Sequence, residues 1–307
     1  MNTRQLKDKI ISQIMGLLCL LVLVLIFFIA FGLYQRARPV LEENNLLKLL
    51  FSSAWHPTKG EFGLASFIVG TAWVTIIALV ISFPLSLLTA IYLSEYCPKR
   101  LREFFKPIID LLAGISPVVY GLWGVIVIVP FVRDHLMPFL SERFSFFPFV
   151  SENYTGFSVI SASIVLAVMI SPLMMAIMEE VMTSVSFGVR EASLSLGATK
   201  WETTKKVVLK KARAGIMAAV ILGLSRAIGE TMAVLMVAGC ALQASLHSIF
   251  DPAYPLPALI ANTYGEMMSI PLYDAAVLLA ALILLGMTVF FNAAGWGILF
   301  YLERNEA

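Results

Sequence analysis

Charged residues are scarce in this chain of 307 residues: Asp, Glu, Lys and Arg make up 14%, whereas a soluble domain has about 25%. Histidine and cysteine are rarer, with three of each, and no CxxC or other metal-ligand spacing occurs. These absences argue against a disulfide framework and a zinc site. A net charge of +2, without a basic stripe interleaved with aromatics, argues against nucleic-acid binding. The sequence also lacks the G-x-x-x-x-G-K-[ST] motif of a P-loop.

The sequence instead has long apolar runs, and 59% of its residues are hydrophobic. About 20 apolar residues cross a bilayer as a helix, so this composition is typical of an all-α polytopic membrane protein. The first run exceeds the apolar core of a signal peptide and no A-x-A site follows it, so an uncleaved helix is expected there. Six transmembrane helices are expected, over residues 14–34, 66–94, 107–131, 157–179, 214–240 and 275–302.

Positive charge predicts the orientation of these helices. The two termini and the loops 95–106 and 180–213 hold 15 of the 22 Lys and Arg residues. Because such residues accumulate in cytoplasmic loops, both termini are expected in the cytoplasm, with the chain crossing a cell (inner) membrane. Residues 1–65 are expected to form an N-terminal transmembrane helix and first outer loop, and residues 66–302 the transmembrane core. The outer loops, with 6 Lys and Arg residues, are expected over 35–65, 132–156 and 241–274.

Two charges stand inside the fifth expected span. Arg226 and Glu230 are four residues apart, in a stretch from Ala214 to Val237 that is otherwise uncharged. One charged side chain at the centre of a bilayer helix costs about 2.5–3.5 kcal/mol. The spacing predicts that both lie on one helix face, where Glu230 would orient and partly neutralise an arginine fork suited to oxyanions. A buried salt bridge that only fixes helix packing explains the pair equally well at this point.

Small residues and prolines mark places where helices come close or break. Gly215, Ala219, Gly223 and Ala227 recur every four residues, which predicts close packing of the fifth span inside a bundle. Prolines lie inside several expected spans: Pro84 in the second, Ser116-Pro117 in the third and Ser171-Pro172 in the fourth. Such interruptions are frequent in transporters, and they also occur as plain packing features.

The longest cytoplasmic loop predicts two short helices separated by a turn. Gly197 is suited to the position just after a helix, and Thr199 stands three residues before Glu202, which is the spacing of a capping box. A structured helix-turn-helix in a loop indicates a docking surface. The alternative is a loop that lies on the membrane, with Trp201 at the interface and lysines on lipid head groups.

The loop resembles the EAA loop of ATP-binding-cassette (ABC) importer permeases. The residues that match are Glu191-Ala192, then Gly197, then a hydrophobic run ending at Leu209, while Ser193 and Lys210 depart from the pattern. In that family the loop is a coupling helix pair that inserts into a groove of an ATPase subunit. The resemblance therefore implies an ATPase-coupling role for Glu191, Ala192, Gly197, Thr199, Trp201 and Leu209.

The fifth span closely resembles the signature of the C-type permease subunit of Pst phosphate importers. The signature here runs from Leu222 to Val234 and includes Arg226-Ala-Ile-Gly-Glu230-Thr231. Two further stretches agree. They are Asp110 to Gly124, where the usual Pro-Ser order is reversed at Ser116-Pro117, and Trp55-x-Pro57 with Phe62-Gly63.

The resemblance implies a type I ABC importer permease (MetI-like) fold with six transmembrane helices, and a transport subunit rather than an enzyme. It implies uptake of inorganic phosphate with a second (A-type) permease, an ATPase dimer that binds ATP and Mg, and an extracytoplasmic phosphate-binding protein. The chain itself is expected to bind no cofactor, no metal and no nucleic acid, and to contact membrane lipid. The implied translocation-path or gate residues are Arg226, Glu230, Thr231, Ser225, Ser116 and Tyr120.

Other functions remain open. The nearest alternatives are a permease for molybdate, sulfate or phosphonate, and the A-type phosphate permease. A membrane-embedded enzyme would need a group of acids, histidines or metal ligands at membrane depth, and the sequence offers none. The coupling loop argues against an autonomous channel or ion-coupled transporter.

Overall fold

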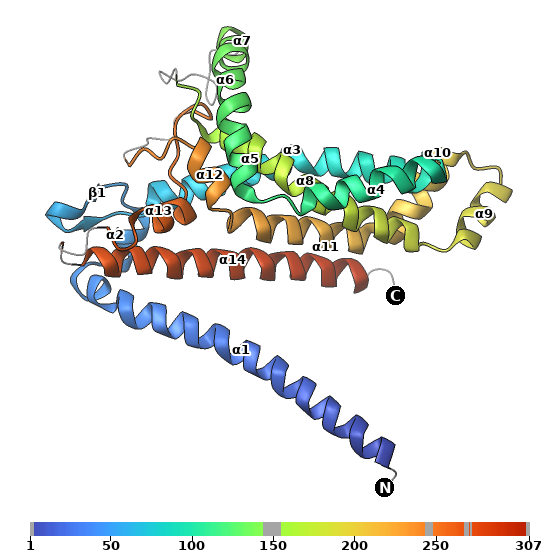
Figure 1. Ribbon diagram of the computed structural model, residues 1–307, viewed down its shortest axis with the longest axis horizontal. Helices are drawn as coiled ribbons and strands as arrows, with labels where there is room; N and C mark the ends of the chain where they lie inside the picture. Colours follow the sequence, from blue (N-terminus) through green and yellow to red (C-terminus); the bar gives the residue numbers. More distant parts are fainter. Residues whose placement is uncertain (1–2, 144–154, 243–247, 267–269, 271, 305–307) are drawn as a thin grey trace.

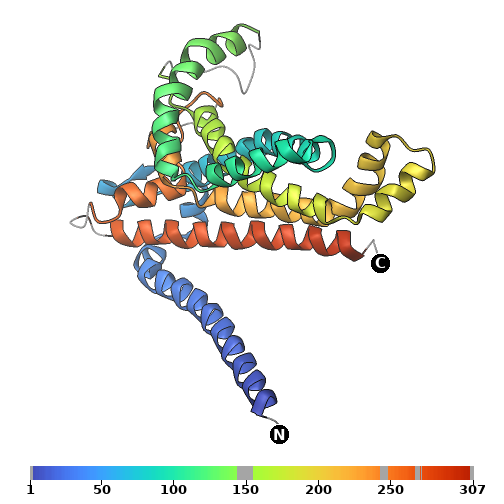
Figure 2. The same cartoon turned by 45° about the vertical axis from the view of Figure 1, so that its right-hand side comes forward.

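A computed structural model describes residues 3–143, 155–242, 248–266, 270 and 272–304 of the chain. Parts of the outer loops expected over 132–156 and 241–274 therefore lie outside the described residues. Helices dominate the structure, and the body is a bundle. Its long helices lie side by side in Figures 1 and 2: α3 (Ala65–Ile91), α8 (Val159–Ser184), α11 (Leu209–Ile228) and α14 (Tyr273–Arg304).

The first helix, α1 (Thr3–Glu43), diverges from this bundle in both views (Figures 1 and 2). Its apolar stretch is 0% buried, and it packs against α14 near its C-terminal end, where Ala37 and Val40 are buried. A helix that exposes an apolar surface on all sides is suited to lipid or to a neighbouring subunit.

Five helical segments within the described residues are long and apolar enough to cross a membrane. Four of them confirm the spans expected over 14–34, 66–94, 157–179 and 275–302. The third and fifth expected spans differ from the structure. The five segments are Lys9–Glu43, Ala65–Tyr96, Pro117–Arg143, Val159–Ser184 and Tyr273–Tyr301.

The third expected span, 107–131, is wrong as a single helix. The amphipathic helix α4 (Lys99–Ala113) ends before Ser116, and a new helical segment begins at Pro117. α4 ends at its C-cap, Gly114, and Ser116 is extended. Pro117 then takes the first position of the new helix, where its missing N–H costs no hydrogen bond. The new segment crosses the direction of the bundle in Figure 1. It consists of α5 (Pro117–Trp123), a π-helical turn (Gly124–Ile128), α6 (Val129–Phe131), a second π-helical turn (Val132–Leu136) and α7 (Met137–Arg143).

The fifth expected span, 214–240, is also interrupted. α11 ends at Ile228, and α12 begins at Met232 and ends at Val237. Glycine is a poor helix former, and Gly229 forms the turn where the first helix stops. With charged residues at both of its ends, α11 is not among the five apolar segments.

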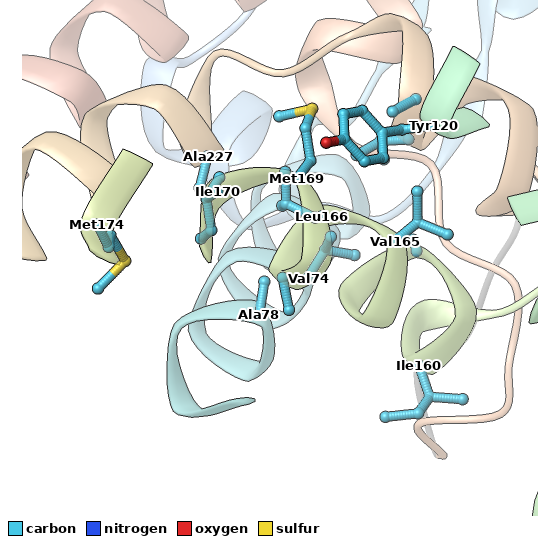
Figure 3. Close-up of a cluster of buried hydrophobic side chains, with 14 of the residues drawn as sticks. Val74, Ala78, Tyr120, Ile160, Val165, Leu166, Met169, Ile170, Met174 and Ala227 are labelled. Atoms are coloured by element: carbon cyan, nitrogen blue, oxygen red, sulfur yellow. The ribbon is translucent and has the colours of Figure 1, made fainter. Parts of the chain in front are cut away.

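The core is centred on α8, whose most apolar stretch is 67% buried. Figure 3 shows Leu166 and Ile170 of α8 among side chains from neighbouring helices, such as Ala78 of α3 and Ala227 of α11. The buried serines of α8 satisfy their hydroxyls on backbone carbonyls, as Ser171 does on Ala167 O at 2.6 Å. A buried hydroxyl without such a partner would cost about 1–3 kcal/mol.

Close packing of α11 against α8 confirms the role predicted for the stripe of small residues. Ala219 and Ala227 are buried. A Cβ atom added to Gly215 would lie 2.3 Å from Val181 Cγ1, and one added to Gly223 would lie 2.7 Å from Met174 Sδ. The glycines therefore allow the two backbones to approach.

The two ends of the bundle differ. One, the hairpin end, carries α2 (Leu46–Phe51), the antiparallel strands β1 (Trp55–His56) and β2 (Glu61–Phe62), and α13 (Leu256–Thr263). Trp55 packs edge-to-face on Phe67 of α3 and Tyr273 of α14, which joins the hairpin to the bundle. The other, the loop end, carries α9 (Phe187–Ser195) and α10 (Lys200–Thr203), and both termini are directed toward it in Figure 1.

A larger residue at position 215 should clash with Val181, and a smaller residue at position 181 should relieve the clash. Gly215→Ala should lower the free energy of unfolding by about 1–3 kcal/mol, because the branched side chain of Val181 has little freedom to move away. The double variant with Val181→Ala should recover most of this loss. Thermal unfolding of the purified protein in detergent measures both effects. Gly286→Ala in α14, with open space around it, is the matched control and should not lower the melting temperature.

Candidate functional site

Arg226 lies in the last turn of α11, half-buried, and reaches the end of α4. Its Nη2 is 3.5 Å from the carbonyl oxygen of Ala113, the final residue of α4. Among the described residues, the ion pairs do not include Arg226. A guanidinium with this one long hydrogen bond to the described part of the chain keeps donors available for another acceptor.

Tyr120 meets the same end of α4. It lies in α5, in the buried cluster that also contains Met169 (Figure 3), and its hydroxyl donates to Leu112 O at 2.8 Å. Ser116 is exposed at the start of α5, three residues beyond Ala113. The structure thus brings Tyr120 and Arg226 to one end of α4, next to the break that precedes Ser116.

Ser225 faces a different neighbour. Its hydroxyl bonds to Ile221 O at 2.9 Å and to Oδ1 of Asn292 in α14. Asn292 was not among the residues predicted from the sequence, although an amide inside the apolar last span is a detectable signal. The bond fixes α11 to α14 one residue before Arg226.

Glu230 does not pair with Arg226, so the predicted ion pair on one helix face is wrong. The two residues stand on opposite sides of the turn at Gly229, and Glu230 is buried. Its Oε1 accepts a hydrogen bond from Ala233 N at 3.3 Å, in the first turn of α12, where a carboxylate also interacts favourably with the helix dipole. Thr231 precedes α12, and its hydroxyl donates to Gly229 O at 3.3 Å.

The loop at the other end folds as the sequence predicts. Gly197 has φ +82, in the left-handed region, between α9 and α10. Thr199 Oγ1 accepts from Glu202 N at 3.2 Å and Glu202 Oε2 accepts from Thr199 N at 2.9 Å, which completes the capping box. The hydrogen bond from the Thr199 backbone lowers the pKa of Glu202. α10 then continues through a π-helical turn (Thr204–Val208) into α11.

The loop exposes large apolar side chains. Leu196 is 89% and Trp201 51% exposed, and Phe187 is exposed as well. Glu191 and Ala192 are also exposed, while Leu209 at the start of α11 is half-buried. Exposed apolar groups on a structured projection are typical of a protein-binding surface.

Arg190 connects the base of this loop to the bundle. Its Nη2 donates to Glu95 Oε1 and to Met182 O, both at 2.8 Å, and its Nη1 donates to Val185 O. Glu95 lies in the π-helical turn Tyr92–Tyr96, which directly follows α3. This pair was not predicted from the sequence, because the two residues are 95 positions apart.

A second buried carboxylate lies near the same end of α8. Glu179 pairs with Arg102 and, at 3.3 Å, with Lys106, both from α4. Arg102 also donates to Thr183 Oγ1 at 2.8 Å. The amphipathic helix α4 is therefore held to α8 by charge at its beginning, while its last residue meets Arg226.

A cavity of about 720 Å³ lies between these elements. It is open on one side and lined by the ends of α3 and α8, the start of α4 and the helices α9 and α10. Its walls include both signs of charge, with Glu95 and Glu191 beside Lys99, Arg102 and Lys200.

Fold and site together define a class: a helical membrane protein with a half-buried cation near a helix break and a projecting loop that exposes apolar side chains. A family model described as binding-protein-dependent transport system inner membrane component matches residues 82–295. The chain is 34% identical over 316 residues to a probable phosphate transport system permease protein PstC of Methanocaldococcus jannaschii, covering 99% of this chain and 97% of that protein. It is 33% identical to PstC of Xylella fastidiosa (strain Temecula1), with 93% and 88% covered. The chain belongs to this inner membrane component family and, within it, to the PstC permeases.

Solved structures confirm the predicted fold. A bacterial alginate ABC transporter, in complex with an alginate pentasaccharide-bound periplasmic protein, matches with a TM-score of 0.58 at 15% identity, covering 96% of this chain and 95% of that chain. An inward-facing MetNI methionine ABC transporter matches with a TM-score of 0.55 at 19% identity, covering 78% and 95%. At these identities the likeness concerns the fold alone.

Because the backbone of Gly197 is left-handed, a substitution there should strain the turn without creating a steric clash. No neighbouring atom of the described structure lies within 4 Å of a Cβ added there. Gly197→Val should therefore destabilise the turn only through backbone strain, which costs about 1–2 kcal/mol. The variant should be cut faster by trypsin after Lys200. Gly197→Asn is the matched control, since asparagine tolerates this region. Equal cleavage of the valine and asparagine variants would show that the turn does not depend on this φ.

Proposed function

We propose that the chain is a permease subunit of an ATP-driven importer of inorganic phosphate. The observation that carries the proposal is Arg226, a half-buried cation at a break between helices, which is not in an ion pair within the described structure. The identity of the transported ion is inferred from the PstC relatives, which are named as phosphate transport system permeases. Arginine stays charged and presents a planar fork that matches phosphate oxygens.

The geometry supports a path that passes Arg226. Thirteen residues separate it from Arg213, near the start of α11, which is about 20 Å of helix. Tyr120 of α5 reaches the same end of α4 as Arg226, so a polar hydroxyl and the cation meet at the helix break. In a site of low dielectric constant, one cation attracts an anion more strongly than in water. Glu230, engaged at α12, leaves this charge unneutralised.

The loop end is assigned to the cytoplasm in this proposal. Both termini and the α9–α10 loop are directed to the same end of the bundle, and the sequence places most Lys and Arg residues there. The exposed surface of Leu196 and Trp201 would dock on an ATPase dimer, which binds ATP and Mg and hydrolyses the ATP. A second, A-type permease would complete the path, and an extracytoplasmic phosphate-binding protein would deliver the ion at the hairpin end.

Replacing the cation tests the path. Arg226→Gln should abolish phosphate uptake by vesicles that contain the complete transporter, while the complex still assembles. Arg226→Lys should retain part of the activity, because the charge remains and the fork is lost. The measurement is uptake of labelled phosphate, with sulfate and molybdate as competitors. Uptake at the wild-type rate by Arg226→Gln would disprove the role, and competition by another oxyanion would reassign the substrate.

A double variant tests whether Arg226 and Glu230 act as an ion pair. If the two charges formed a pair, the double variant Arg226→Gln with Glu230→Gln would regain activity by removing both. Because Glu230 instead caps α12, we expect no recovery of uptake in the double variant. Recovery would restore the ion-pair hypothesis.

Docking is tested separately at Trp201. Trp201→Ala should weaken retention of the ATPase subunits on the order of 10-fold or more, as expected when an aromatic anchor is removed from an interface. Retention is measured by copurification of the ATPase with the tagged permease, followed by titration of the permease with the ATPase. Trp296→Ala removes an exposed tryptophan from α14 and is the matched control. Unchanged retention by Trp201→Ala would place the docking surface elsewhere.

A further inference from the structure

The guanidinium of Arg190 joins three segments at one point. Its hydrogen bonds reach Glu95, at the end of α3, and the carbonyl oxygens of Met182 and Val185, at the end of α8. The side chain of Arg190 is 14% exposed and that of Glu95 is 7% exposed. Arg190 itself belongs to α9, the first helix of the loop.

The chemistry of this junction makes Arg190 hard to replace. The last four carbonyls of a helix have no partner within that helix, and a cation near them is favourable. Arg190 meets this need for α8 and, with the same group, neutralises a buried carboxylate. Removing it would leave Glu95 without its partner and the carbonyls of Met182 and Val185 without this donor.

The second helix of the loop is continuous with a different long helix. α10 passes through the π-helical turn into α11 without a break, so it is continuous with the helix that carries Arg226. Between α9 and α10 lies the turn at Gly197. The hydroxyls of Ser193 and Thr203, 2.9 Å apart, form a side-chain link across that turn.

We propose that Arg190, through Glu95, is a positioning residue for energy coupling, which fixes α9 to α3 and α8. A force on the loop then moves α9 with α3 and α8, and α10 with α11, so that the two bodies shift against each other. The inference rests on the proposed function, in which the loop docks on an ATPase. It concerns transmission of the force and not docking itself.

The test compares transport with ATP hydrolysis in the same preparation. Complete transporters with Arg190→Gln are reconstituted in vesicles with the phosphate-binding protein, and labelled phosphate uptake and ATP hydrolysis are both measured. The complex should retain its ATPase subunits and hydrolyse ATP. The phosphate transported per ATP should fall roughly fivefold or more, the range of typical coupling energies.

Further variants separate the contacts. Arg190→Lys keeps the charge but not the fork, and should restore part of the ratio. Glu95→Gln should be milder than Arg190→Gln, because the bonds to the two carbonyls remain. The double variant should be no worse than Arg190→Gln alone, since both changes remove one shared interaction. Arg38→Gln breaks an exposed Arg–Glu pair in α1 and is the control, with an unchanged ratio.

The outcomes are distinct. An unchanged ratio in Arg190→Gln, or loss of its ATPase subunits, would overturn the proposal, because Arg190 would then be dispensable or part of docking. If Arg190→Gln does not accumulate in the membrane, Glu95→Gln decides by the same two criteria. If the wild-type complex itself neither retains an ATPase nor transports phosphate, the proposed function fails instead.

Discussion

Burial of α8 is the constraint on which the rest of the structure depends. A helix enclosed by its neighbours must satisfy its polar groups internally, and Ser163 and Ser171 do so on carbonyls one turn back. Its charged residues stand at the loop end, and its last carbonyls stand there too. Cations from α4 and α9 bind this end, so a single helix determines where the amphipathic helix and the coupling loop attach.

The break after α11 has a comparable effect on the candidate path. In a continuous helix, Arg226 and Glu230 would neutralise each other and an anion would gain little from either. The turn at Gly229 gives the carboxylate an acceptor role at α12 and leaves the guanidinium beside a carbonyl at 3.5 Å. The same sequence motif thus yields an available cation instead of an ion pair, because α11 ends before Gly229, between the two charges.

Features set by local chemistry could be predicted from the sequence. The apolar runs, the capping box at Thr199 and the turn at Gly197 depend on neighbours in the chain, and they were predicted correctly. Helix breaks were harder, because span length alone does not show whether Pro117 or Gly229 bends a helix or ends it. Contacts between distant segments could not be predicted: the pairing of Arg190 with Glu95 is decided by which helices pack together.

The two ends of α11 explain how a distant docking event could matter at Arg226. A helix transmits displacement along its axis, but coupling between sites requires an element with two arrangements. α11 is bounded by the turn at Gly197, beyond α10, and by the turn at Gly229. Gly215 and Gly223 let it lie closely against Val181 and Met174 of α8. On the proposed function, α11 is therefore the unit that moves, and α8, fixed by charge to α4 and α9, is the surface along which it moves.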